Sequence, residues 1–319
     1  MLSSKALVCL AYLASPILGL AFPQLPEIFK RASTAYRTEI LSVETIFDAE
    51  NKGTYQLIDA TGDGVPDLAY IKTSTSSGKV EVYIASASSD YRQVILDTET
   101  IFPADSDGSW LLVPSSNTTL PDLVHIKTVN TASRYVEVDW PLGENEFQVK
   151  GNTYKSIYPL SVFKPTIKGF WSLYSYNGDG VLDLVYIRTS DSGTKKVEVH
   201  VGSGAKQYGA FTNEQGTVMP LDNNGRYFLA PYSSKTAVDL VYIKDTNAGL
   251  KEVEVHVAAK SGSYNKWTFE DGSMFPQGTG EHNSIFSLVD FSNDGILDLA
   301  RVQFQNTTTG NVEITVASG

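Results

Sequence analysis

Asp183-Leu-Val-Tyr-Ile-Arg188 is one of five copies of a single hexapeptide pattern in this chain. The other copies follow at intervals of 55 to 61 residues and begin at Asp67, Asp122, Asp239 and Asp298. Each copy leads through turn-forming residues into a second short run, of which Lys196-Val-Glu-Val-His-Val201 is typical. Apolar and polar residues alternate in both runs, which is the pattern of β-hairpin strands. Recurrence at a nearly fixed interval indicates a repeat architecture.

Two more strands are expected in each repeat. One precedes the aspartate, as in Phe170–Tyr174, and one follows the Val-Glu-Val run, as in Tyr91–Leu96. Four strands in one repeat make an antiparallel sheet, and repeated sheets of this kind most often stack radially as blades. The predicted fold class is therefore all-β, a five-bladed β-propeller of four-stranded antiparallel blades.

The two ends of the chain complement each other. The last repeat stops at Gly319, just after its third strand, and so lacks a fourth. The segment Tyr36–Phe47 closely resembles Tyr91–Phe102, which contains the fourth strand of the first complete repeat. We expect the N-terminal strand to complete the last blade, which closes the ring and leaves no sheet edge open.

The N-terminal segment predicts secretion. Residues 1–21 have the features of a signal peptide, because Lys5 precedes an apolar run that is too short and too interrupted to span a bilayer. Residues 22–31 are expected to form a propeptide that ends at the Lys30-Arg31 pair, with an uncleaved surface pair as the alternative. Residues 32–319 then form a single propeller domain, and we expect it to be extracellular.

Composition narrows the class of partner. Residues 1–31 contain three basic residues and one acidic residue, so their removal leaves 22 basic against 35 acidic residues and a net charge of −13. Such a surface argues against nucleic acid and anionic membranes as partners. The only cysteine is Cys9, so the mature chain has no disulfide. Asn117 and Asn306 begin Asn-Thr-Thr sequons and are candidate glycosylation sites. We expect a monomeric glycoprotein without a membrane span.

Three of the five loops before the repeat aspartate carry oxygen-bearing side chains at positions 1, 3, 5 and 9. Calcium takes six to eight oxygen ligands, and a glycine after position 5 permits a turn that aims the backbone carbonyl of position 7 inward. We predict up to three structural Ca²⁺ sites, formed by Asp59, Thr61, Asp63, Val65 and Asp67, by Ser175, Asn177, Asp179, Val181 and Asp183, and by Asp290, Ser292, Asp294, Ile296 and Asp298.

Two alternatives limit this metal prediction. The loops 114–122 and 231–239 keep only the final aspartate and should be metal-free. The three complete loops could also be Asp-Gly turns that side-chain hydrogen bonds hold without any metal.

The complete loops resemble the FG-GAP/VCBS repeats of integrin α-subunit propellers and of some fungal propeller lectins. The longer pattern, in which Asp-Leu-Val-Tyr-Ile-Lys-Thr is followed by a glycine and then by Lys-Val-Glu-Val-His-Val-Ala-Ser, is similar to repeats in secreted filamentous-fungal proteins. This similarity covers almost all of residues 36–319. The resemblance implies a propeller with metal in the three complete loops, and an adhesion, lectin or cell-wall role.

The sequence contains no catalytic signature that we recognise. His200 and His256 occupy a repeat position that is Tyr, Asp or Thr in the other copies, and His125 replaces a repeat tyrosine. The repeated glutamates are expected to pair across the hairpin with basic residues rather than to act as catalytic carboxylates; they are Glu81, Glu137, Glu198, Glu254 and Glu313, opposite Lys72, Lys127, Arg188, Lys244 and, as the exception, Gln303.

Aromatic residues are the remaining candidates for a sugar site, because sugar C–H faces stack on rings. Trp140 and Trp267 depart from the repeat pattern and are the candidates for ligand contact, with packing as the alternative. The leading prediction is a secreted, non-catalytic carbohydrate- or cell-wall-binding protein of lectin type, with avidity from repeated blades. The alternatives are a glycan hydrolase or lyase that uses the propeller channel, and a protein-interaction adhesin or effector.

Overall fold

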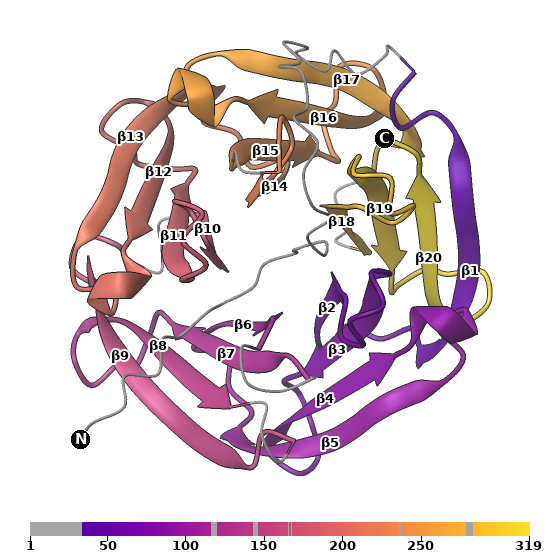
Figure 1. The fold of residues 1–319 in the computed structure, drawn as a ribbon, viewed down its shortest axis with the longest axis horizontal. Coiled ribbons are helices and arrows are strands. Elements are labelled where there is room, and N and C mark those ends of the chain that lie inside the picture. Colours follow the sequence, from indigo (N-terminus) through magenta and orange to yellow (C-terminus); the bar gives the residue numbers. More distant parts are fainter. Residues whose placement is uncertain are drawn as a thin grey trace, which may run out of the picture.

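The computed structural model describes residues 34–115, 120–142, 146–164, 166, 168–235, 238–278 and 283–319. The signal peptide, the propeptide with its Lys30-Arg31 pair, and Asn117 lie outside these residues. The described residues form five four-stranded antiparallel sheets around a ring, as predicted (Figure 1). No helix among them has the length and apolar character needed to cross a membrane.

Blades 1 to 4 each use four consecutive strands, in sheet order from the centre of the ring outward (Figure 1). Blade 1 contains β2 (Gly53–Ile58), β3 (Asp67–Lys72), β4 (Lys79–Ala85) and β5 (Val94–Pro103). Blade 2 contains β6 (Gly108–Val113), β7 (Asp122–Lys127), β8 (Tyr135–Leu142) and β9 (Val149–Pro159). Blade 3 contains β10 (Gly169–Tyr174), β11 (Asp183–Arg188), β12 (Lys196–Gly202) and β13 (Phe211–Pro220). Blade 4 contains β14 (Gly225–Ala230), β15 (Asp239–Lys244), β16 (Glu252–Ala258) and β17 (Trp267–Pro276).

Blade 5 joins the two ends of the chain. It contains β18 (Ser284–Val289), β19 (Asp298–Gln303), β20 (Asn311–Ala317) and, outermost, β1 (Glu39–Asp48). The first strand lies antiparallel to β20, with Leu41 opposite Val316 (Figure 1). The predicted closure by the N-terminal strand is confirmed.

The apolar core lies between blades, because both faces of the middle strands are covered. All of the first five residues of β11 are buried, for example. Val185 and Val199 of blade 3 pack in one cluster with Leu240 and Tyr242 of blade 4. Alternation within each strand thus supplies one apolar face to each neighbouring blade.

An aromatic residue in the left-handed backbone region links each pair of neighbouring blades. Its carbonyl oxygen accepts a hydrogen bond from the outer strand of the preceding blade, as between Tyr264 and the Val218 amide at 2.8 Å. These residues have φ between +56° and +63° and are at most 4% exposed; they are Tyr36, Tyr91, Phe147, Tyr208 and Tyr264. Left-handed backbone is unfavourable for a bulky residue, so burial and the hydrogen bond offset that cost.

Four of the repeat aspartates, in blades 1, 3, 4 and 5, each hold two parts of their own blade together. The Asp239 carboxylate accepts a hydrogen bond from the Ser233 amide in the preceding loop, at 2.7 Å. Its other oxygen accepts one from the Lys260 amide, at 2.8 Å, in the short 3₁₀ helix η3 (Lys260–Gly262). Asp67, Asp183 and Asp298 form the same bridge. Because backbone amides are obligatory donors, this bridge explains why the aspartate recurs in these four blades.

Candidate functional site

Two rings stack across the inner strands in four of the five blades. The ring centroids of Tyr55 and Tyr70 in blade 1 are 4.3 Å apart. The pairs in the next three blades have centroid distances of 4.0, 4.2 and 4.1 Å; they are Trp110–His125, Trp171–Tyr186 and Tyr227–Tyr242. Blade 5 places Arg301 opposite Phe286 instead.

Blade 1 shows one way in which the second ring of the pair is held. The Tyr70 hydroxyl donates to the Glu50 carboxylate at 2.9 Å, and the Tyr83 ring lies 6.1 Å from the Tyr70 ring. Glu50 also pairs with Lys52 and Lys72, each at 2.8 Å. Burial raises the pKa of Glu50, but these three partners outweigh it and lower the pKa to about 2. The Tyr70 side chain is therefore held both by stacking of its ring and by the hydrogen bond of its hydroxyl.

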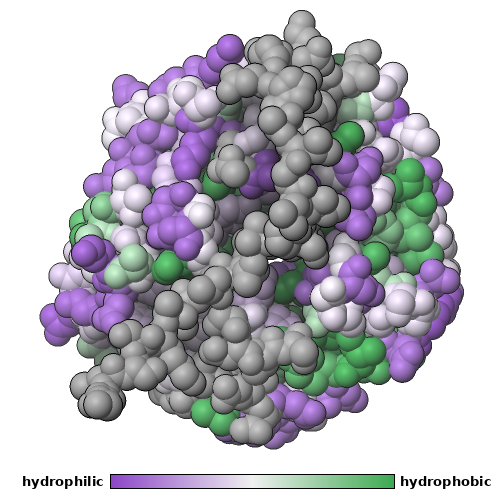
Figure 2. Space-filling model, viewed as in Figure 1, coloured by the Kyte–Doolittle hydropathy of each residue, from purple (hydrophilic) through white to green (hydrophobic). Residues whose placement is uncertain are grey.

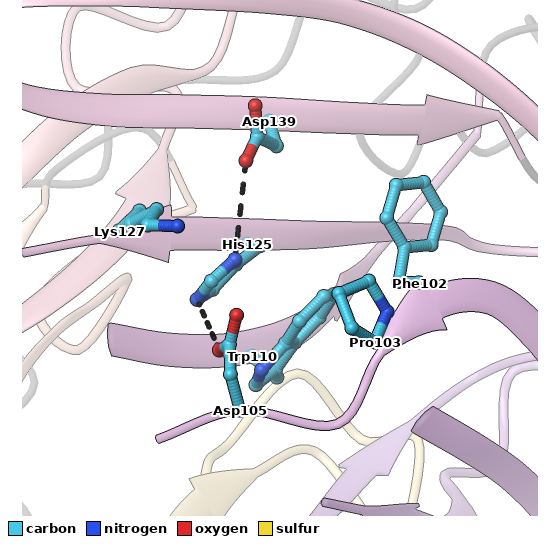
Figure 3. Close-up of a pocket in the computed structure, with 7 residues that line it drawn as sticks. All are labelled: Phe102, Pro103, Asp105, Trp110, His125, Lys127 and Asp139. Atoms are coloured by element: carbon cyan, nitrogen blue, oxygen red, sulfur yellow. Dashed lines mark ion pairs between the residues drawn. The ribbon is translucent and has the colours of Figure 1, made fainter. Parts of the chain in front are cut away.

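Blade 2 leaves this place open. His125 stands where blade 1 has Tyr70, and Asp139 stands where it has Tyr83. Both replacements are smaller than tyrosine, and a cavity of about 180 Å³ results (Figure 3). It lies where β5 leads into β6, and its lining combines rings with charged groups: Phe102, Pro103, Asp105, Trp110, His125, Lys127 and Asp139. A cavity below about 300 Å³ suits one ring-sized group rather than a drug-sized ligand.

His125 lies between two carboxylates in this cavity. Its Nε2 atom is 3.5 Å from Asp105 Oδ1, and its Nδ1 atom is 3.9 Å from Asp139 Oδ2 (Figure 3). The side chain is only 4% exposed. Burial lowers the pKa of His125, and the two aspartates offset this effect only in part, so burial favours the neutral imidazole.

Two buried nitrogen atoms in the cavity wall lack hydrogen-bond partners. Within the described part of the chain, neither Trp110 Nε1 nor His125 Nε2 has a hydrogen-bond partner. Buried polar groups are nearly always bonded, so unmet ones indicate a ligand or a water molecule. Asp139 accepts a hydrogen bond from the Thr153 hydroxyl, and Lys127 Nζ lies 3.5 Å from Asp107.

The predicted cross-strand ion pairs are only half right. Lys72 lies opposite Glu81 and Lys244 opposite Glu254, as expected. The lysines, however, form ion pairs with acidic residues in the loop that leads into the first strand of the blade, as Lys244 does with Asp222 at 3.1 Å. Glu254 instead accepts the Leu250 amide at 2.9 Å. The glutamate satisfies an amide of its own hairpin turn, which is a local need that the repeat pattern did not reveal.

The first and fifth acidic loops form tight turns around their first aspartate. In the first, the Asp59 carboxylate accepts the amides of Gly62, Asp63 and Gly64 at 2.7 to 3.2 Å. In the fifth, Asp290 accepts the amides of Asp294 and Gly295, each at 3.0 Å. The loop side chains Thr61 and Ser292 and the carbonyl-bearing Val65 and Ile296 belong to the same two turns.

A lysine from the next blade contacts the third acidic loop. The Lys260 ammonium donates to the Tyr176 carbonyl and lies 3.9 Å from the centre of the Tyr176 ring. Ser175 accepts the Gly180 amide at 2.9 Å, and Asn177 donates to Asp179. Lys260 also lies close enough to Asp183, the final aspartate of this loop, for their charges to interact.

The final aspartate of each acidic loop is already bonded to backbone amides. Burial also raises the pKa of Asp67 and of Asp183, which disfavours their charged forms. Across the described ranges, no three His, Cys, Asp or Glu side chains gather in a way that could hold a metal ion. The predicted ligand sets also include hydroxyl, amide and backbone carbonyl oxygens, so calcium in these loops remains a prediction.

The other predicted residues lie away from the cavity. Trp140 is half-buried and packs among the side chains between blades 2 and 3, although its neighbour Asp139 lines the cavity. Trp267 is half-buried and packs between blades 3 and 4. Asn306 is exposed, as a glycan acceptor must be. The cavity itself was missed, although its signal was present in the replacement of a repeat tyrosine by His125.

His200 and His256 have matching surroundings in neighbouring blades. His200 lies 3.3 Å from both Glu198 and Glu214. His256 lies 3.2 Å from Glu254 and 3.3 Å from Glu270. Both imidazoles thus bridge two glutamates, and neither contributes to the cavity in blade 2.

Comparisons with known proteins show likeness in structure alone. No protein-family model matches the chain, so the resemblance to FG-GAP/VCBS repeats is not confirmed. No curated protein matches it. Among solved structures, an Agrocybe aegerita lectin described as recognising non-reducing terminal N-acetylglucosamine is 15% identical with a TM-score of 0.41, over 83% of this chain. The chain spans 65% of that lectin's length.

Two glycoside hydrolases also match. A GH62 hydrolase solved with xylotriose is 10% identical with a TM-score of 0.48, over 91% of this chain and 99% of that one. The catalytic domain of the Coprinopsis cinerea GH62 α-L-arabinofuranosidase is 10% identical with a TM-score of 0.48, over 89% and 98%. Likenesses this distant do not identify the ligand of this chain.

Proposed function

We propose that this protein is a secreted carbohydrate-binding propeller of lectin type, and that the cavity in blade 2 holds one sugar unit. The observation that carries the proposal is the cavity at the Tyr-to-His replacement, with two unmet buried polar atoms in its wall. Secretion rests on the signal peptide expected in residues 1–21.

The lining has the chemistry that a sugar ring requires. Phe102 and Trp110 supply apolar ring surface for C–H groups, while Asp105, Asp139 and Lys127 supply acceptors and a donor for hydroxyls. The Trp110 indole N–H needs an acceptor, which a sugar hydroxyl provides. A small number of polar groups around apolar surface is typical of small-molecule sites.

A glycan and cell-wall polysaccharide screen tests the proposal when it includes the variant His125→Tyr. This change restores the residue of blades 1, 3 and 4, so we expect the variant to fold and its phenol to fill the cavity. The wild-type protein should give glycan signals that the variant loses. Signals that are equal for both proteins, or absent for both, would overturn the proposal.

Two further variants separate binding from folding. Asp139→Asn keeps the size of a lining side chain but removes its charge, and it should weaken the same signals. Asp222→Asn is the matched control, because Asp222 precedes blade 4 at the position that Asp105 holds before blade 2. It should leave binding unchanged. The melting temperature of each variant shows whether a lost signal reflects a lost fold.

A further inference from the structure

The surroundings of His125 contain a mismatch of hydrogen-bonding groups. A neutral imidazole has one N–H donor and one nitrogen acceptor, whereas a carboxylate only accepts. Asp105 faces Nε2 and Asp139 faces Nδ1. Whichever nitrogen carries the proton, the lone pair of the other faces a carboxylate oxygen. The free protein therefore holds one acceptor against another in a buried place.

Protonation of His125 is the simplest internal remedy, but burial opposes it by lowering the pKa of the imidazole. The charged groups that surround the cavity are Asp105 and Asp107 in the β5–β6 loop, Lys127 on β7 and Asp139 on β8. With a neutral imidazole these groups carry three negative charges and one positive charge. The cavity is thus short of both a donor and a positive charge.

An ammonium group supplies both. It carries three N–H donors, a positive charge and no acceptor, so it can donate both to Asp105 and to the free Nε2 nitrogen of His125, while Nδ1–H faces Asp139. The rings of Phe102 and Trp110 tolerate a cation, because their faces carry partial negative charge. An N-acetyl group brings one donor and one acceptor and is larger, and a hydroxyl brings one donor, two acceptor lone pairs and no charge.

We infer that the blade 2 cavity selects an amino sugar with a free ammonium group over the N-acetylated or neutral sugar of the same ring. This inference rests on the proposed function and specifies its ligand class. Trp110 Nε1–H would then donate to a ring hydroxyl, and Asp105 and His125 Nε2 would accept from the ammonium. Asp139 would face Nδ1–H and so keep the proton away from Nε2.

Calorimetric titration of the full mature protein with glucosamine, N-acetylglucosamine and glucose oligosaccharides tests this selectivity. We expect the glucosamine oligomer to bind about 10-fold more tightly or better, the effect of one charge-assisted hydrogen bond. Asp139→Asn should remove most of this preference, and Asp222→Asn should keep it.

The outcomes distinguish the inference from the proposed function. Equal or tighter binding of the N-acetylated or neutral oligomer would overturn the amino-sugar inference while leaving carbohydrate binding in place. A preference for glucosamine that persists in both Asp139→Asn and His125→Tyr would also overturn it, because the selectivity would then come from the acidic surface at large. The absence of any sugar binding would overturn both.

Discussion

The Met274 amide donates a 2.8 Å hydrogen bond to the carbonyl oxygen of Tyr36, across the junction between blade 4 and blade 5. The same bond joins the other four junctions, as from Ile46 to Tyr91 at 3.0 Å. Tyr36 precedes the strand β1, so the N-terminal segment supplies both the fourth strand of blade 5 and its link to blade 4. The ring is therefore closed by two contacts, the pairing of β1 with β20 and the hydrogen bond between Met274 and Tyr36.

Tyr36→Ala should destabilise the protein strongly. The side chain is fully buried, and loss of a large buried aromatic group costs about 3–5 kcal/mol. Urea denaturation of the mature protein measures the change. Arg37→Ala is the control, because its ion pair with Glu252 is partly exposed and worth at most about 1 kcal/mol. A Tyr36→Ala variant as stable as wild type would show that closure does not depend on this junction.

Asp239→Ala should also destabilise, with no dependence on calcium. The change leaves the amides of Ser233 and Lys260 without their acceptor, at a cost of about 1–3 kcal/mol for each unmet group. The loop of this aspartate lacks the other acidic positions, so we expect no metal to bind there. Chemical denaturation with and without chelator is the measurement. An unchanged midpoint would contradict the bridging role.

Calcium should raise the melting temperature if the loops that begin at Asp59 and Asp290 bind it. A ligand that binds only the folded protein stabilises it by about 2.7 kcal/mol at 100 times its dissociation constant. Thermal melts at millimolar calcium and in chelator measure the effect, and Asp59→Asn with Asp290→Asn should reduce it. Identical melting curves in calcium and chelator would refute a stabilising metal and leave the loops as hydrogen-bonded turns.

His125 should make the protein less stable as the pH falls. Burial lowers its folded-state pKa below the usual 6.5, so the unfolded chain takes up a proton before the folded protein does. Stability from the neutral imidazole is present above the unfolded pKa and is lost as the pH falls from there through the folded pKa. The free energy of unfolding, measured from pH 7.5 downward, should decline less in His125→Tyr. A decline of equal slope in both proteins would contradict this.

The blades could be predicted from the sequence because each repeat contains strand-length runs of alternating apolar and polar residues, and such runs form β-strands. The Tyr36–Phe47 segment even revealed the closing strand. The site was harder to predict because it is defined by missing volume. The sequence shows that His125 and Asp139 depart from the repeat. Only the structure shows that the surrounding side chains, such as Phe102 and Trp110, do not fill the space that these smaller residues leave.

The acidic loops show the opposite difficulty. Their oxygen pattern is easy to recognise, but the sequence does not show where each oxygen points. Asp67 binds amides of its own blade, and Lys260 reaches the Tyr176 carbonyl from the next blade. Contacts made by residues far apart in the chain thus decide which side chains remain free for a ligand.

The indole N–H resonances of the four tryptophans provide the most direct test of sugar binding in blade 2. The resonance of Trp110, assigned with Trp110→Phe, should shift and saturate as an amino-sugar oligomer is added. Those of Trp140, Trp171 and Trp267 should stay in place. The shift should vanish in His125→Tyr, whose phenol fills the cavity. Saturable shifts confined to Trp140 or Trp267, or no shift at all, would contradict a binding site in this cavity.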